Sequence, residues 1–218
     1  MSGGVIVRRC LLGLIVASVL WGGAVSGTKF ALSGFAPVTL LAAELAAAAA
    51  VLWLGLLARG YRAPRVWWLP VVLGLLEPAL AYLCETLGLS MTSAVHGALL
   101  SGLESALVVV LAALVLRETI TVSAALAVLV AVGGLIVLAG PGASHGAAAG
   151  DLLVAGGVLS ASLYTIVAKR FDDGSDPLTL TTWQFTVAAL AAGDRGGTDG
   201  KREPRVHTLV DLTTGQIS

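Results

Sequence analysis

Long apolar runs, separated by short polar links, fill most of the chain. They lie at about 10–28, 38–58, 66–89, 93–116, 119–140, 152–168 and 177–192. About twenty apolar residues cover the hydrocarbon core of a bilayer as a helix, so the first six runs predict membrane-spanning helices, and the seventh is shorter. The links are rich in Gly, Pro, Ser and Arg, which is typical of turns between antiparallel membrane helices. The pattern predicts an all-α, polytopic membrane helix bundle.

Composition supports the membrane class. The chain is 57% apolar and 12% charged, and a soluble fold of this size would have to bury nearly every helix on all sides. Cys10 and Cys84 both lie inside apolar runs, so no disulfide framework, metal site or cofactor is expected. A basic start followed by an apolar run also fits a cleaved signal peptide. The equally apolar segments that follow favour an uncleaved first helix.

Basic residues are distributed unequally between alternate loops. One set of loops and ends contains Arg8, Arg9, Arg59, Arg62, Arg65, Arg117, Lys169 and Arg170, whereas the other contains Lys29. Because cytoplasmic loops retain positive charge, this distribution predicts a multi-pass protein of the cell membrane with a cytoplasmic amino terminus. Nucleic-acid binding is not expected, since the basic residues are spread over several loops and form no patch.

The chain contains a repeat at an offset of 140 positions. Matching residues are Lys29 and Lys169, Gly34 and Gly174, Pro37 and Pro177, Thr39 and Thr179, and Leu40 and Leu180. Five predicted helices separate equivalent positions, so the second copy is expected to be inverted in the membrane. Inverted repeats are a construction principle of secondary transporters, whose substrates bind between the two halves near the bilayer midplane.

Several short motifs resemble the EamA family of drug and metabolite transporters. The matching positions are Trp21-Gly22 with Lys29, Pro37, Thr92-Ser93-Ala94, Leu103-Glu104, Glu118, Gly150-Asp151-Leu152-Leu153, Ala161-Ser162-Leu163-Tyr164-Thr165 and Lys169-Arg170. The chain has Ser105 where that family usually has proline, and Arg117 where glycine is usual. The resemblance implies ten helices in two inverted five-helix halves around a central cavity that carries small polar metabolites, commonly amino acids or related compounds.

This comparison divides the chain into three parts. Residues 1–141 are expected to form a first five-helix repeat, residues 150–192 the start of an inverted second repeat, and residues 193–218 a polar, disordered tail. A second repeat of equal length would continue to about position 280, as repeat regularity implies. The expectation is therefore a truncated or frame-shifted end, with a genuine soluble tail as the alternative.

Four glutamates lie inside predicted helices: Glu44, Glu77, Glu85 and Glu104. An ionised carboxylate in a membrane is costly unless it is paired, protonated or exposed to water, so each is a candidate for a substrate or proton pathway. Glu104 matches the Leu-Glu-Pro position of the family, and a structural hydrogen-bonding role is its alternative. Glu77 adjoins Pro78, which predicts a kink whose freed backbone groups need polar partners.

Lys29 is a further candidate. In the cavity it would favour carboxylate substrates, whereas at the membrane interface its side chain would only extend toward water. Three aromatic residues are expected either to stack on a substrate or to pack inside the bundle: Trp21, Tyr82 and Tyr164. Structural roles are predicted for the remaining candidates. Glu44 is expected to pair with Lys29, and Glu118 to pair with Arg117 or to start a helix. Gly133 and Gly134 are expected to permit close helix approach.

The leading hypothesis is a secondary transporter that exports a small metabolite with proton coupling through buried glutamates. The alternative is a truncated, non-transporting membrane protein, or a subunit that needs a partner or a second copy, as a homo-oligomer, to complete its bundle. Enzyme function is not expected, because the chain has no zinc-protease, nucleophile-elbow or phosphate-loop motif. The expected partners are the lipid bilayer and a small-molecule substrate.

Overall fold

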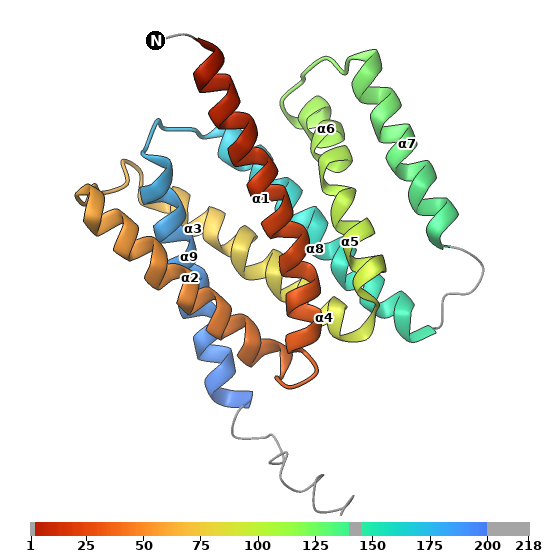
Figure 1. The fold of residues 1–218 in the computed structure, drawn as a ribbon, viewed down its shortest axis with the longest axis horizontal. Helices are drawn as coiled ribbons and strands as arrows, with labels where there is room; N and C mark the ends of the chain where they lie inside the picture. Colours follow the sequence, from red (N-terminus) through yellow and green to blue (C-terminus); the bar gives the residue numbers. More distant parts are fainter. Residues whose placement is uncertain (1–2, 140–144, 200–218) are drawn as a thin grey trace, which may run out of the picture.

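The computed structural model describes residues 3–139 and 145–199, and this part of the chain forms helices and no strand. Figure 1 shows their arrangement. The elements are α1 (Gly3–Ala31), α2 (Pro37–Arg59), α3 (Trp68–Gly74), the irregular segment η1 (Leu75–Leu80), α4 (Ala81–Met91), α5 (Ala94–Gly102), α6 (Glu104–Val115), α7 (Val122–Ala139), α8 (His145–Arg170) and α9 (Pro177–Asp199). The predicted all-α bundle is confirmed.

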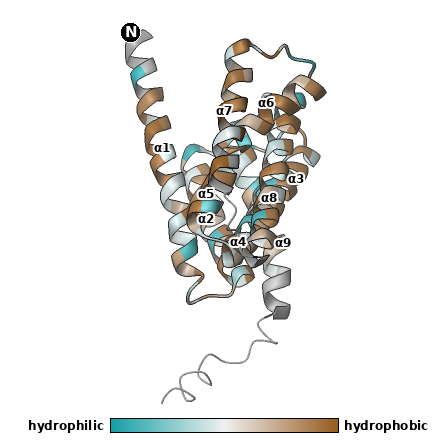
Figure 2. Cartoon of the chain, turned by 90° about the vertical axis from the view of Figure 1, so that its right-hand side faces the viewer, coloured by the Kyte–Doolittle hydropathy of each residue, from teal (hydrophilic) through white to brown (hydrophobic). Residues whose placement is uncertain are grey.

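Five helical segments are long and apolar enough to cross a bilayer. They are Cys10–Ala31, Pro37–Arg59, Trp68–Met91, Ala94–Val115 and Ala148–Arg170. The fifth predicted helix corresponds to α7, whose described apolar stretch, Val122–Gly134, is shorter than a full span. The chain is thus a multi-pass membrane protein, and Figure 2 shows apolar residues along most of its helices.

Two of the spanning segments are interrupted near their middle. Between α3 and α4, Glu77 has φ −149° and ψ 125°, which breaks the helix immediately before Pro78. The predicted kink is therefore present. The break frees backbone carbonyls from intrahelical bonding, and the Ser160 hydroxyl on α8 donates to one of them, Leu76 O, at 2.8 Å. The second interruption is Leu103, which separates α5 from α6.

The bundle is built from two close helix pairs, α4 with α8 and α2 with α9. Leu41, Leu45, Ala188 and Ala192 form an apolar core between α2 and α9. α1 lies at the side of the bundle (Figure 2), and its side chains from Leu11 to Leu20 are exposed. In a membrane protein such an apolar surface faces lipid or another helix.

Glycines bring α4 and α8 into close contact. A Cβ atom added to Gly88 would lie 2.7 Å from Gly150 O, and one added to Gly157 would lie 2.8 Å from Ala81 O. The backbones can approach this closely only because these positions have no side chain. Close packing of α8 against α4 positions both helices beside the cavity described below.

The last described helix is longer than expected. The polar tail was expected to begin at residue 193, whereas α9 continues to Asp199. An established helix adds one hydrogen bond for each further residue, so it can extend beyond its apolar core. The rest of the expected tail, 200–218, lies outside the described residues.

Candidate functional site

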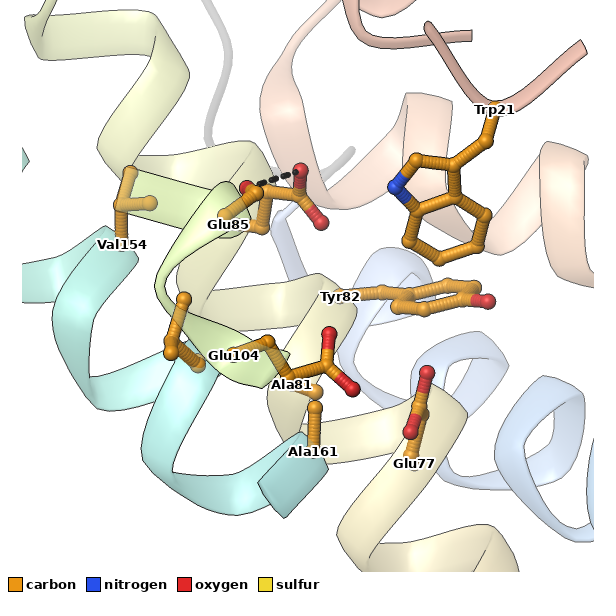
Figure 3. A pocket seen from close by; sticks show the side chains of 11 residues that line it. Trp21, Glu77, Ala81, Tyr82, Glu85, Glu104, Val154 and Ala161 are labelled. Atoms are coloured by element: carbon orange, nitrogen blue, oxygen red, sulfur yellow. Dashed lines mark hydrogen bonds between the residues drawn. The ribbon is translucent and has the colours of Figure 1, made fainter. Parts of the chain in front are cut away.

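A small cavity lies between α1, η1, α4, α5, α6 and α8. Five of the residues predicted for a substrate or proton pathway line it together: Trp21, Glu77, Tyr82, Glu85 and Glu104. Figure 3 shows the three glutamate side chains around the space beside the Tyr82 ring. The wall on the α8 side consists of small apolar residues, Val154, Gly157, Val158 and Ala161. The cavity thus combines an acidic side with an apolar one.

Both helix interruptions place a carboxylate at this cavity. Glu77 is the extended residue that breaks η1, and Glu104 is the first residue of α6, directly after the break at Leu103. Leu103 keeps helical dihedral angles, with φ −73° and ψ −14°, so this second interruption is a local irregularity, whereas Glu77 has left the helical conformation. Interrupted helices supply substrate and ion sites in secondary transporters, because their broken backbone is tolerated only where it lines a cavity or is buried in protein.

Glu85 is positioned from a neighbouring helix. The Ser101 hydroxyl on α5 donates to Glu85 Oε1 at 3.4 Å, and Ser101 also lines the cavity (Figure 3). Sequence reasoning did not identify Ser101. The available signal was its spacing, since Ser101 and Glu104 are three residues apart and helical residues at that spacing share a face.

An aromatic pair borders the acidic side of the cavity. The Trp21 and Tyr82 ring centroids are 6.2 Å apart with an interplanar angle of 65°, an edge-to-face arrangement. The described lining of the cavity contains neither lysine nor arginine. A cation therefore meets carboxylates and aromatic faces there, whereas an anion finds no opposite charge.

A second, larger hollow continues from the first along α1. The two share Trp21, Tyr82 and Glu85, and the second also contacts Thr28, Glu44 and Leu89. Glu44 Oε1 accepts a hydrogen bond of 3.3 Å from the Thr28 hydroxyl. All four predicted intramembrane glutamates therefore lie along these adjoining hollows.

Lys29 does not line either hollow and does not pair with Glu44 in the described part of the chain. Its ammonium group instead donates to Leu89 O and Thr92 O, the latter at 2.6 Å. These carbonyls lie at the carboxyl end of α4, where a cation satisfies unpaired acceptors and interacts favourably with the helix dipole. The predicted Glu44–Lys29 pair is thus replaced by two separate interactions.

Two other candidates make contacts that differ from those expected. The Tyr164 hydroxyl donates to Gln184 Oε1 of α9 at 3.3 Å, and Tyr164 is outside the lining of the cavity. Glu118 pairs with Lys169 of α8 at 2.6 Å, whereas a partnership with Arg117 or a helix start was predicted. Sequence proximity favoured Arg117, but the fold brings the end of α8 to this turn.

Gly133 and Gly134 of α7 make no close helix contact with the described residues. An added Cβ atom at either position would have no neighbouring atom within 4 Å outside its own helix. The close approach that was predicted for this pair occurs at Gly88, Gly150 and Gly157. Gly150 and Gly157 are seven residues apart, a spacing that puts two residues on one helix face and that could have identified them.

The chain is similar to known transporter sequences. The model of the EamA-like transporter family matches residues 8–140. The "Uncharacterized transporter YyaM" of Bacillus subtilis (strain 168) is 29% identical over 109 residues, which cover 48% of this chain and 36% of that protein. The chain thus spans about a third of the length of that relative. No solved structure matches.

The family match covers more than half of the chain and includes most of α1 and all of α2 to α7. It contains Trp21, Glu77, Tyr82, Glu85 and Glu104, the residues that α1 to α6 contribute to the acidic side of the cavity. The chain belongs to the EamA-like transporter family.

Proposed function

We propose that the protein is a proton-coupled secondary transporter that exports small, amine-bearing metabolites through the acidic cavity. The observation that carries this proposal is the convergence of Glu77, Glu85 and Glu104 on one cavity inside a membrane bundle. Carboxylates at membrane depth are costly, at about 3 kcal/mol each on insertion scales, so three in one place point to a pathway.

The charge of the cavity supports both the coupling and the class of solute. Like charges repel strongly in a medium of low dielectric constant, so binding a proton or an organic cation lowers the electrostatic energy of the three carboxylates. Protons and a protonated amine therefore compete for the same groups. Such competition is the basis of an exchange of solute for protons, because binding of one favours release of the other.

The Trp21 and Tyr82 rings favour one class of solute. Trp21 and Tyr82 offer ring faces beside the carboxylates, which stabilises ammonium groups and apolar surface together. Amino-acid-like compounds would present their amine to this side and their apolar part to the α8 wall. Since the lining includes neither lysine nor arginine, we expect solutes with a net positive charge to be preferred over anions.

We also propose that the protein lies in the cell membrane with its amino terminus in the cytoplasm. The bias of Lys and Arg toward alternate loops supports this orientation. Two residues of the basic set are close to the carboxyl end of α8: Lys169 lies in its last turn, and Arg65 donates to Asp173 O just beyond it. Protease accessibility of a tag at the amino terminus, in intact cells compared with inverted vesicles, tests the orientation.

Transport is tested with purified protein in liposomes under an imposed pH gradient, with radiolabelled amino acids and cationic dyes as solutes. The expected result is saturable flux that Glu104→Gln reduces at least tenfold, because glutamine cannot release a proton at the position where Glu104 lines the cavity. Asp172→Asn is the matched control: it removes one negative charge from an exposed loop and should leave the flux unchanged. Equal flux in Glu104→Gln and wild type would remove Glu104 from the mechanism.

A further inference from the structure

Four helices meet where the turn between α4 and α5 begins. On one side, the Lys29 ammonium group of α1 donates to Leu89 O and Thr92 O. On the other, the Thr92 hydroxyl donates to Asp151 Oδ1 of α8 at 2.6 Å. His96 of α5 also contacts this carboxylate, with 3.3 Å between Nδ1 and Oδ2. The same short turn is therefore held from both sides by polar groups.

These contacts are built into the fold. Thr92 is 5% exposed, so its polar atoms depend on protein partners. Thr92 caps the carboxyl end of α4, and Ser93 caps the amino end of α5 by accepting from His96 N at 3.1 Å. The Lys29 charge supplements the α4 cap from a different helix. The turn is thus fixed both by local caps and by helices that are distant in sequence.

The position of the turn relates these contacts to the transport pathway. The hollow that extends from Glu85 reaches Thr28 and Leu89, the chain neighbour and one hydrogen-bond acceptor of Lys29. The turn contacts therefore lie where this hollow ends. The Lys29 contacts join α1 to the turn at this end of the hollow.

We propose that Lys29, Thr92 and Asp151 form a gate that closes this end of the pathway. We call these three residues the turn clamp. It ties α1 and α8, which border the cavity on two sides, to the same turn. Opening this end requires the Lys29 ammonium group to leave the carbonyls of Leu89 and Thr92. Lys29 is thereby a positioning residue of the gate and does not bind the solute; the inference rests on the proposed transport function.

The opposite end of α8 offers a comparison. Lys169 and Glu118 form an ion pair there, with side chains 58% and 47% exposed. Exposed pairs contribute little stability because water screens them. The turn clamp has a half-buried lysine and a buried threonine, and hydrogen bonds to charged groups in such surroundings are worth more. We expect the two ends to differ in how strongly they resist opening.

The gate is tested by the accessibility of a thiol in the cavity. Cys10 and Cys84 are replaced by alanine and Ser101→Cys is introduced as the reporter, since Ser101 lines the acidic cavity. A membrane-impermeant thiol reagent is applied from the Lys29 side to cells or to vesicles of defined orientation. We expect Lys29→Met to increase the labelling rate about tenfold, because charge-assisted hydrogen bonds hold the closed state.

Three further variants test whether faster labelling results from loss of the turn clamp. Lys29→Arg retains hydrogen-bond donors and should label as slowly as the parent, whereas Thr92→Val removes the bond to Asp151 and should label faster. Lys169→Met is the matched control, because it removes a lysine charge at the other end of α8 and should leave the rate unchanged. If Lys29→Met fails to insert, Thr92→Val provides the test.

Unchanged labelling in both Lys29→Met and Thr92→Val would overturn the gate, and so would an equal increase in Lys169→Met. The assay needs no solute and no proton gradient. A protein without transport activity can thus still show a working gate, and the failure of the gate is distinguishable from the failure of the proposed transport function.

Discussion

At the scale of single residues, Arg117 has an unusual backbone conformation. Its φ is 57°, in the left-handed region, and it lies in the turn between α6 and α7. Residues with a Cβ atom are strained there by roughly 1–2 kcal/mol, whereas glycine is not. Glycine, which the resemblance to the EamA family led us to expect at this position, would adopt this conformation without strain, so Arg117 marks a site where this chain carries strain.

Arg117→Gly should therefore increase the free energy of unfolding by about 1 kcal/mol, since the relieved strain exceeds the extra chain entropy of glycine. Denaturant unfolding in detergent micelles measures the change. Arg117→Ala removes the same charge but keeps the Cβ atom, so it should give no gain. A stability gain shared by both variants would mean that the charge, and not the backbone, is responsible.

Residue chemistry also shows how much of the site the sequence could predict. Glu77, Glu85 and Glu104 were singled out because carboxylates are rare in apolar helices, and all three line one cavity in the structure. Lys29 and Glu44 were expected to pair because their charges are opposite. Their actual partners are backbone carbonyls and a hydroxyl, which every segment offers and which leave no distinctive sequence signal.

At the scale of elements, the apolar runs predicted where helices occur but not how they are interrupted. Pro78 signalled the break near Glu77, because proline lacks the backbone N–H that a continuous helix needs. The break at Leu103 had no comparable signal, since Gly102 is the only helix-weakening residue beside it. The resulting position of Glu104 at the start of α6 could not be predicted from hydrophobicity.

Helix contacts were harder to predict than helix positions. Gly133 and Gly134 are adjacent and conspicuous, yet α7 lies at the edge of the bundle (Figure 1). The contact between α4 and α8 depends on Gly88, Gly150 and Gly157. Which glycine faces a neighbour is decided by the rotation of each helix in the bundle, and apolar residues on all sides of a membrane helix give little indication of that rotation.

Adjacent glycines of α8 provide a sharp test of this contact. Gly157→Ala should destabilise the protein by about 1–3 kcal/mol, because the new methyl group meets Ala81 O and overpacks the interface. Gly156→Ala has nothing within 4 Å and should be neutral or slightly stabilising, since alanine favours helix. Thermal unfolding of both variants in detergent makes the comparison; equal effects would contradict the α4–α8 packing described above.

At the scale of the whole molecule, the bundle has two ends with different polar contacts. Lys29, Thr92 and Asp151 meet at one end. At the other, Arg65 donates to Asp173 O at 2.9 Å, and hydrogen bonds from Ser175 hold the pKa of Asp173 below its usual value. The acidic cavity lies between these ends, as alternating access to a central site requires.

The homo-oligomer stays a prediction, because the exposed apolar surface is compatible with more than one assembly state. Apolar side chains along α1, including Leu14, Val19 and Leu20, are more than half exposed. Lipid covers such a surface as well as another helix does, so exposure alone does not distinguish a monomer from the predicted homo-oligomer. Cross-linking in native membranes, compared with detergent, measures the assembly state directly.

In the proposed function, solute and protons exchange through the acidic cavity. The most direct measurement is the internal pH of dye-loaded liposomes that contain the purified protein, after a gradient of a transported amino acid or cationic dye is applied without an initial pH difference. We expect the solute gradient to drive a pH change in wild type and in Asp172→Asn, and none in Glu104→Gln. Solute flux in wild type without any pH change would contradict the coupling.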